Sequence, residues 1–130
     1  MKTINTSGKR KSAIARASIS TGKGIIKINN QLLESINSSF IISKIQEPLM
    51  LAKDAVSKVN IDVKVKGGGW NGQTDAVRVA IARGLTKFQS NLKKVFLEYD
   101  RGLLVPDIRR KEPRKPNDSK ARAARQKSYR

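Results

Sequence analysis

The sequence predicts one small domain of mixed α and β structure over residues 1–105, followed by an extended basic tail over residues 106–130. Residues 61–66 alternate β-branched with charged side chains, which is typical of a strand with one buried face. Residues 74–88 repeat apolar side chains at helical spacing. The last 25 residues carry ten Lys or Arg against three acids, with almost nothing apolar, so they cannot contribute to a core. About a hundred residues remain, which is enough for one modest core.

The amino-terminal third of this domain is predicted to be mainly strand. Residues 12–20 and 25–28 are two short runs rich in Ala and Ile, and the glycines of TGKG at residues 21–24 permit a tight reversal. This pattern predicts a hairpin between the two runs. Residues 1–20 are also Ser-rich and acid-free, as organelle transit peptides are, but their alternation favours a strand. Residues 32–36 then predict one or two helical turns.

Two helices are expected on either side of the strand at residues 61–66. Glu47 and Pro48 are predicted to open the first one, because proline is tolerated in a first turn. Thr74 is a plausible N-cap of the second helix, where Asp75 would suit the positive end. Its predicted core stripe consists of Val77, Ile81, Gly84, Leu85 and Phe88.

A last helical segment is expected at residues 91–99. Its core side chains are predicted to be Leu92, Val95, Phe96 and Tyr99, and the core should end near Val105. The order of elements, two strands, a helix, a strand and then helices, indicates mixed α and β structure around a small sheet, either α+β or a small α/β domain.

The charge of the chain indicates a polyanionic partner. The 28 basic and 10 acidic residues give a net charge of +18 and a pI of about 10.8. Residues 1–105 account for +11 of this charge, with 18 basic and seven acidic residues, so the folded part is basic in its own right. Both the domain and the tail are therefore expected to bind phosphate groups.

The residue types that are missing argue against an enzyme. The chain has no cysteine and no histidine, which removes thiol nucleophiles, thiolate metal sites and the side chain that titrates near neutral pH. The carboxylates that remain are scattered, so no cofactor and no catalytic site is expected. The longest apolar runs have about four residues, against roughly 20 for a bilayer span, and the chain is expected to be soluble.

The glycine-rich loop before the long helix has three possible explanations. Gly67, Gly69 and Gly72 match the GxGxxG fingerprint of dinucleotide-binding proteins. That fingerprint needs an acid that ends a second strand about 20 residues on, whereas Glu98 and Asp100 follow a helical segment, so nucleotide binding is disfavoured. The glycines can instead allow a tight strand-to-helix turn, and the amides at the helix start can hold a nucleic-acid phosphate. We favour these two explanations together.

Several motifs, in order, resemble one family. The segment GKRKSAIARA at residues 8–17 resembles the opening of the ninth protein of the small ribosomal subunit, a universal ribosomal protein family. EPL at 47–49, GGG at 67–69, GQ at 72–73, DAVR at 75–78 and AIARGL at 80–85 resemble its central motifs. RRKEP at 109–113 and the closing QKSYR resemble its archaeal and eukaryotic branch.

The resemblance implies a fold like the second domain of small-subunit protein five, with a left-handed βαβ crossover, in the head of the cytoplasmic ribosome. It further implies binding to ribosomal RNA beside neighbouring head proteins, no catalysis, and a tail that reaches transfer RNA in the peptidyl site. By position, Lys127 and Arg130 are the residues expected at the transfer RNA. One departure concerns residues 115–120 (KPNDSK), which stand where this branch usually has a glycine-rich link.

A set of basic residues other than Lys127 and Arg130 is expected to bind ribosomal RNA, and arginine and lysine differ in how they do so. Arginine pairs with phosphate bidentately and stacks on bases, so the arginines of the tail are better placed than its lysines to specify geometry. The residues expected to bind ribosomal RNA are Lys9, Arg10, Lys11, Arg16, Lys64, Lys66, Arg109, Arg110, Lys111, Arg114, Lys115, Lys120, Arg122 and Arg125.

The main alternative is a histone-like protein that binds DNA without sequence preference. It would share the charge, but it usually needs a groove-entering helix, a ribbon or an apolar wedge, and the tail offers none clearly. A membrane-surface role is also disfavoured, because the tail lacks an apolar face that would insert.

Overall fold

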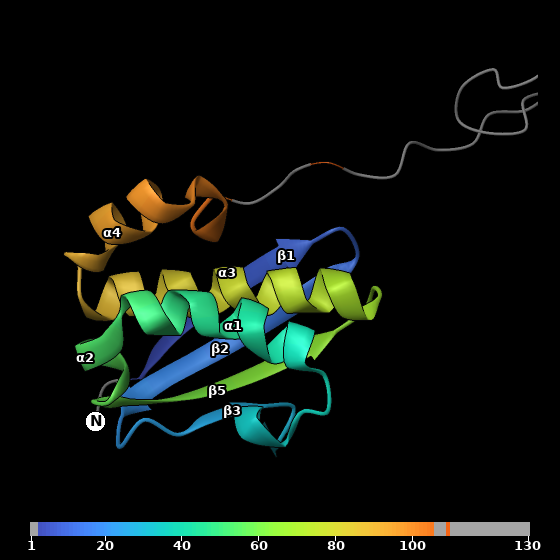
Figure 1. The fold of residues 1–130 in the computed structure, drawn as a ribbon, viewed down its shortest axis with the longest axis horizontal. Helices are drawn as coiled ribbons and strands as arrows, with labels where there is room; N and C mark the ends of the chain where they lie inside the picture. The colour runs from blue at the N-terminus through green and yellow to red at the C-terminus, as the bar shows by residue number, and fades with distance from the viewer. Residues whose placement is uncertain (1–2, 106–108, 110–130) are drawn as a thin grey trace, which may run out of the picture.

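A five-stranded mixed sheet with helices over one face forms the body of the protein (Figure 1). The structure is a computed structural model, and it describes residues 3–105 and 109. In spatial order the strands are β1 (Ile4–Arg10), β2 (Ala13–Thr21), β5 (Val59–Lys66), β3 (Ile26–Ile28) and β4 (Gln31–Leu32). The helical elements are η1 (Leu33–Ser35), α1 (Ser39–Leu51), α2 (Lys53–Val56), α3 (Trp70–Phe88), α4 (Leu92–Tyr99) and η2 (Arg101–Leu103). This architecture confirms the predicted α+β class.

The hairpin predicted between residues 12–20 and 25–28 is wrong. Strand β2 pairs with β1 on one side and with β5 on the other, both antiparallel, so β5 lies between β2 and β3. The glycine segment carries the chain around the start of β5, where the amides of Gly22 and Gly24 donate to the carbonyls of Lys58 and Val59, each at 2.9 Å. The true hairpin joins β1 and β2 through a tight turn in which Lys11 has φ of 54°.

Strands β3 and β5 are parallel neighbours, with Ile26 opposite Ile61. The chain that joins them passes through α1 and α2. In Figure 1 the helices lie nearer the viewer than the sheet, both strands run from left to right, and β5 lies above β3. That arrangement makes the β3–α1–β5 crossover left-handed, against the strong right-handed preference of such units.

Helix α1 begins eight residues before the predicted start. The side chain of Ser38 caps it by accepting from the amide of Ile41 at 3.4 Å, which is the usual role of serine at this position. Pro48 lies inside the helix, near its end, and not in the first turn. Its missing amide costs one hydrogen bond in the last turns, where the helix is about to end anyway.

Helix α3 also begins earlier than predicted, at Trp70. Thr74 is not its N-cap, because the Thr74 hydroxyl donates to the carbonyl of Trp70 from inside the helix, at 2.7 Å. Val77, Ile81 and Leu85 of the predicted stripe are buried, whereas Phe88 is partly exposed at the carboxyl end.

Helix α4 confirms half of its predicted core contacts. Leu92 and Phe96 are buried, but Val95 and Tyr99 are exposed. Leu103 of η2 is fully buried, so the core ends close to the predicted position. Among the described residues, none of the helices is long and apolar enough to cross a membrane.

Small residues bring α3 close to the sheet. Ala13, Ala15 and Ala17 of β2 face the helices and are buried. On β1, a Cβ added at Gly8 would lie 2.3 Å from the carbonyl oxygen of Ala76, so only glycine fits there. The Thr6 hydroxyl donates to the Ala80 carbonyl at 2.9 Å. One face of the sheet is thereby closed by a tightly packed helix.

Candidate nucleic-acid interface

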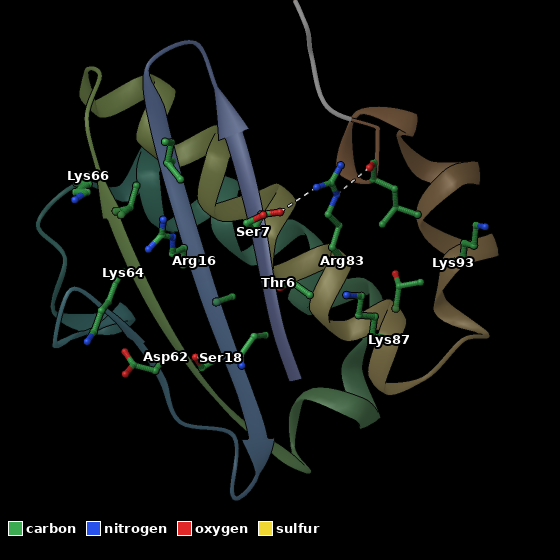
Figure 2. Close-up of a pocket in the computed structure, with 16 residues that line it drawn as sticks. Thr6, Ser7, Arg16, Ser18, Asp62, Lys64, Lys66, Arg83, Lys87 and Lys93 are labelled. Atoms are coloured by element: carbon green, nitrogen blue, oxygen red, sulfur yellow. Dashed lines mark hydrogen bonds between the residues drawn. The ribbon is translucent and has the colours of Figure 1, made fainter. Parts of the chain in front are cut away.

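The face of the sheet opposite the helices is polar and basic. Alternation along the strands places Arg16 of β2 and Lys64 and Lys66 of β5 on this face, and all three side chains are exposed. Figure 2 shows them on neighbouring strands with the helices behind the sheet. We call this surface the open face. It consists of Asn5, Ser7 and Lys9 on β1, Ile14, Arg16 and Ser18 on β2, Lys27 on β3, and Asp62, Lys64 and Lys66 on β5.

Strand register places like charges side by side on the open face. Arg16 lies directly opposite Lys64, and Ser7 flanks Arg16 on the other side. The next row of paired residues across β1, β2 and β5 lies two residues away along each strand. In that row, Ile14 separates Lys9 from Lys66. Like charges opposite each other on neighbouring strands destabilise a sheet by a few tenths to about 1 kcal/mol. A bound phosphate would remove that repulsion, so the arrangement favours an anionic ligand.

The open face is not uniformly basic. Asp62 is exposed and lies opposite Ser18 on one side and Lys27 on the other. It is the acid of the face, and it lies one row away from the Arg16–Lys64 pair. The strongest positive field therefore lies toward the end of the sheet that holds Lys9 and Lys66.

A groove continues from the open face around the β1 edge toward α3 and α4 (Figure 2). Arg83 of α3 lies at this edge and donates to two backbone carbonyls, that of Ser7 at 3.0 Å and that of Leu104 at 3.3 Å. These bonds join β1 to the segment that leads into the tail. Further lining comes from Asn5, Thr86, Lys87 and Lys93. Hydroxyls, amides and cations of this kind are the usual partners of phosphate and ribose oxygens.

Of the residues predicted to bind RNA, the structure brings four to the open face. Lys9, Arg16, Lys64 and Lys66 lie there, and Lys11 is exposed in the adjoining turn.

Arg10 is placed differently, on the helix side of β1. Its Nε lies 3.6 Å from a carboxylate oxygen of Asp75, and its side chain is 18% exposed. This ion pair also explains Asp75, which sequence reasoning assigned to the helix end. Arg10 therefore ties β1 to α3.

Most of the tail lies outside the described residues. Arg109 is described, and it is exposed. The predictions for Arg110, Lys111, Arg114, Lys115, Lys120, Arg122, Arg125, Lys127 and Arg130 fall on residues outside the described part of the chain.

Three basic residues of the groove were not named as site residues from the sequence. Arg83, Lys87 and Lys93 come from helices that the chain reaches long after β1 and β2. The available signal was the spacing of Arg83 and Lys87, four residues apart and off the apolar stripe of α3. That spacing places Arg83 and Lys87 on one side of the helix, but it does not predict which strand lies beside them.

The glycine-rich loop serves as a tight turn. Gly67 and Gly68 have φ of 82° and 66°, and their backbones approach Ser12 and Ala13 of the β1–β2 turn. The side chain of Gln73 donates to the Gly67 carbonyl at 3.1 Å, which closes the loop. In the described residues α4 follows α3, so the second parallel strand that a dinucleotide fold requires is not found there.

Comparison with known proteins finds a match over almost the whole chain. Residues 8–130 match the profile of a family described as ribosomal protein S9/S16. The chain belongs to the ribosomal protein S9/S16 family. Among its relatives is the small ribosomal subunit protein uS9 of Methanothrix thermoacetophila, 51% identical over the full length of both chains.

Two more S9/S16 relatives carry the same name. That of Thermoplasma volcanium is 50% identical over 98% of each chain, and that of Methanococcus maripaludis is 48% identical over the full length of both. All three come from archaea, as the motifs of the tail predicted. The match extends through residue 130, so the basic tail is part of the S9/S16 family pattern.

Proposed function

We propose that this chain is a structural component of the small ribosomal subunit, which binds ribosomal RNA through the open face and the groove. The tail extends from this anchor to the transfer RNA in the peptidyl site. The protein performs no chemistry and acts in the cytoplasm, where it supports translation as part of the ribosome. The single observation that carries this proposal is a basic sheet face, which the described residues leave exposed, in a member of the S9/S16 family.

The open face supports RNA binding for a physical reason. A helix-free sheet surface offers a broad, shallow contact of the kind that fits an RNA backbone or its wide minor groove. Arg16 supplies a planar fork for phosphate oxygens, and Lys64 and Lys66 supply point charges beside it. Each phosphate that these residues neutralise releases counterions, so affinity is expected to fall steeply with salt.

The connection between the body and the tail supports the second part of the proposal. Arg83 bonds the carbonyls of Ser7 and Leu104, so the last described turn is held against the edge of the open face. The tail that follows this turn in the sequence adds a net charge of +7, from ten basic residues and three acids, to a body that is already basic. Lys127 and Arg130 lie at its far end and are the residues proposed to contact transfer RNA.

Crosslinking in cells tests the first part of the proposal. The full chain is crosslinked to its nucleic acid, purified, and the attached nucleic acid is sequenced. We expect small-subunit ribosomal RNA, with the crosslinked peptides on β1, β2 and β5. Recovery of chromosomal DNA in its place would favour the histone-like alternative and reject the proposal.

Removal of residues 127–130 tests the tail. Small subunits should still assemble, because the open face is intact, but transfer RNA should dissociate faster from their peptidyl site. The measurement is the dissociation rate of labelled transfer RNA from purified subunits, with Asn117→Ala and Ser119→Ala together as the control, because these two changes keep the length and the charge of the tail. A collapse of assembly would show instead that the end of the tail is an anchor on ribosomal RNA.

A further inference from the structure

An exposed aromatic pair lies at the amino-terminal ends of the two helices that cover the sheet. Trp70 is the first residue of α3, and Phe40 is the second residue of α1. Their rings meet edge to face, with centroids 5.8 Å apart and planes at 80°. Despite this contact, Trp70 is 59% exposed and Phe40 is 51% exposed. Two large aromatic rings left in water contribute little to folding, and they are typical of a binding surface.

The surroundings of the pair are fixed before any ligand arrives. The Lys44 ammonium lies 5.0 Å from the centroid of the Phe40 ring, and the same group contacts Asn71 at 3.4 Å and Asp75 at 3.3 Å. These contacts connect α1 to α3 beside the Phe40 ring. The ring of Phe40 is thus supported by a cation on one side.

The backbone that carries Trp70 is also held, yet it is open to approach. The loop before it packs on the β1–β2 turn and is closed by Gln73, as described above. At Gly69, immediately before Trp70, an added Cβ would meet no atom within 4 Å. A flat ligand can therefore come close to the chain at this point, and the rings need no rearrangement to receive it.

The charges around the pair favour a nucleic acid over an apolar protein segment. The loop that ends at Trp70 starts at Lys66, which belongs to the open face, and it packs against the turn that holds the exposed Lys11. The nearest acid on α3, Asp75, is engaged by both Lys44 and Arg10. The rings consequently stand on the helix side of the sheet, at the same end of the sheet as Lys9 and Lys66 (Figure 1).

We propose that Trp70 is a stacking platform for an unpaired base of the RNA whose backbone lies on the open face, and that the nearly perpendicular Phe40 ring holds Trp70 in place. The inference rests on the proposed function for the identity of the partner as RNA. Unpaired bases stack on aromatic side chains, and nearby cations hold the adjacent phosphates, whereas a base inside a duplex has no free face to offer. The platform therefore selects a loop, a bulge or a single-stranded end of the RNA, not a duplex.

Fluorescence gives a direct test, because Trp70 is the one tryptophan of the chain. The full-length protein is titrated with a short single-stranded RNA, with a blunt duplex of the same sequence, and with inorganic polyphosphate. We expect the single strand to quench Trp70 emission, and we expect the duplex and the polyphosphate to bind without quenching. Binding of the single strand without any change in emission would overturn the proposal.

Variants separate stacking from charge. Trp70→Ala should weaken single-strand binding about tenfold and leave polyphosphate binding unchanged, whereas Trp70→Phe should keep most of the affinity. Tyr99→Ala removes an equally exposed aromatic from α4 and is the matched control, which should bind as the wild type does. Circular dichroism confirms that each variant is folded. Equal single-strand affinity of Trp70→Ala and wild type would overturn the proposal.

A crosslink in the assembled subunit identifies the occupant. A photoreactive p-benzoylphenylalanine placed at position 70 should crosslink to a nucleotide that is unpaired in the ribosomal RNA. A crosslink to a neighbouring protein, or to a paired nucleotide, would reject the platform while leaving the proposed function intact. If the wild-type chain bound no small-subunit RNA in any of these assays, the proposed function and the platform would both fail.

Discussion

The two faces of the sheet are built from alternate residues of the same strands, yet they carry opposite kinds of side chain. On β2, Ala15 and Ala17 point to the helices and are buried, while Arg16 between them is exposed on the other side. On β5, Ile61 and Val63 are buried, and Lys64 beside them is exposed. A period of two residues thus separates a folding surface from a binding surface.

The two faces of the sheet meet different physical demands. The covered face needs small and apolar side chains, because α3 approaches closely enough for Gly8 to lie against its backbone. The open face carries like charges in register, which costs stability and which the proposed RNA partner would offset. Substitutions on the covered face should therefore alter stability, and those on the open face should alter binding.

The largest expected effect is the loss of a buried side chain from the covered face. Ile61→Ala leaves a cavity under the helices, and the free energy of unfolding should fall by about 3 kcal/mol. Urea unfolding followed by circular dichroism measures it. Asp62→Ala, the next residue on the same strand, is the control and should change stability by about 0.5 kcal/mol or less. Equal losses from both variants would show that the two faces are not distinct.

A slightly smaller loss is expected where α3 meets β1. Gly8→Ala places a methyl group against the backbone of Ala76, and forcing the two elements apart should cost about 2 kcal/mol. Gly72→Ala is the control, because its added methyl group would meet ordinary contacts of 3.4 Å and more, and alanine favours the helix. The midpoint temperature of thermal unfolding should be lower than that of the wild type for Gly8→Ala only. A neutral Gly8→Ala would mean that the close approach is not needed.

The open face should show its effect in binding. The double variant Arg16→Ala with Lys64→Ala should lose about tenfold in affinity for small-subunit RNA, and the slope of log affinity against log salt should fall by about 1.5. Filter binding over a range of salt concentrations measures both quantities. The matched control is Lys53→Ala with Lys58→Ala, which removes the same charge from exposed positions on and just after α2. Equal losses in the control would indicate attraction by net charge alone.

The smallest expected effect is that of a charge reversal at Lys64, which should raise stability and lower RNA affinity. Lys64→Glu replaces the repulsion across from Arg16 with an attraction, so the free energy of unfolding should rise by about 0.5 kcal/mol. RNA affinity should nevertheless fall, because a negative charge now faces the phosphates. Urea denaturation measures the change in the free energy of unfolding, and filter binding on the same sample measures the change in RNA affinity. A variant that loses stability as well would contradict the account of the open face as a surface strained by its own charge.

Much of the local structure could be read from the sequence. The alternation at residues 61–66 predicted β5 and assigned its faces correctly, because a period of two is a property of the chain itself. The apolar stripe of α3 was found for the same reason, with helical spacing. The start of α1 is not predicted, because proline favours the first turn of a helix, whereas Pro48 lies near the end of α1 and the cap is Ser38.

The candidate site was only partly predictable. Lys9, Arg16, Lys64 and Lys66 were identified by charge, and alternation placed the two lysines of β5 on one face. Their meeting with Arg16 depends on the pairing of β2 with β5, between strands some forty residues apart. Arg83 was missed as a site residue because its contact with Ser7 joins positions at opposite ends of the domain.

By itself, the sequence determined the fold class, the basic character of the body and tail, and the family. These properties follow from composition, periodicity and ordered motifs, all of which are local to the chain. Only the tertiary structure decided which strands are neighbours, and it placed β5 where a hairpin of β2 and β3 was expected. Strand order depends on which surfaces can be buried together, and that balance is set by contacts between distant segments. The open face, the Arg83 bonds and the Trp70–Phe40 pair all follow from that order.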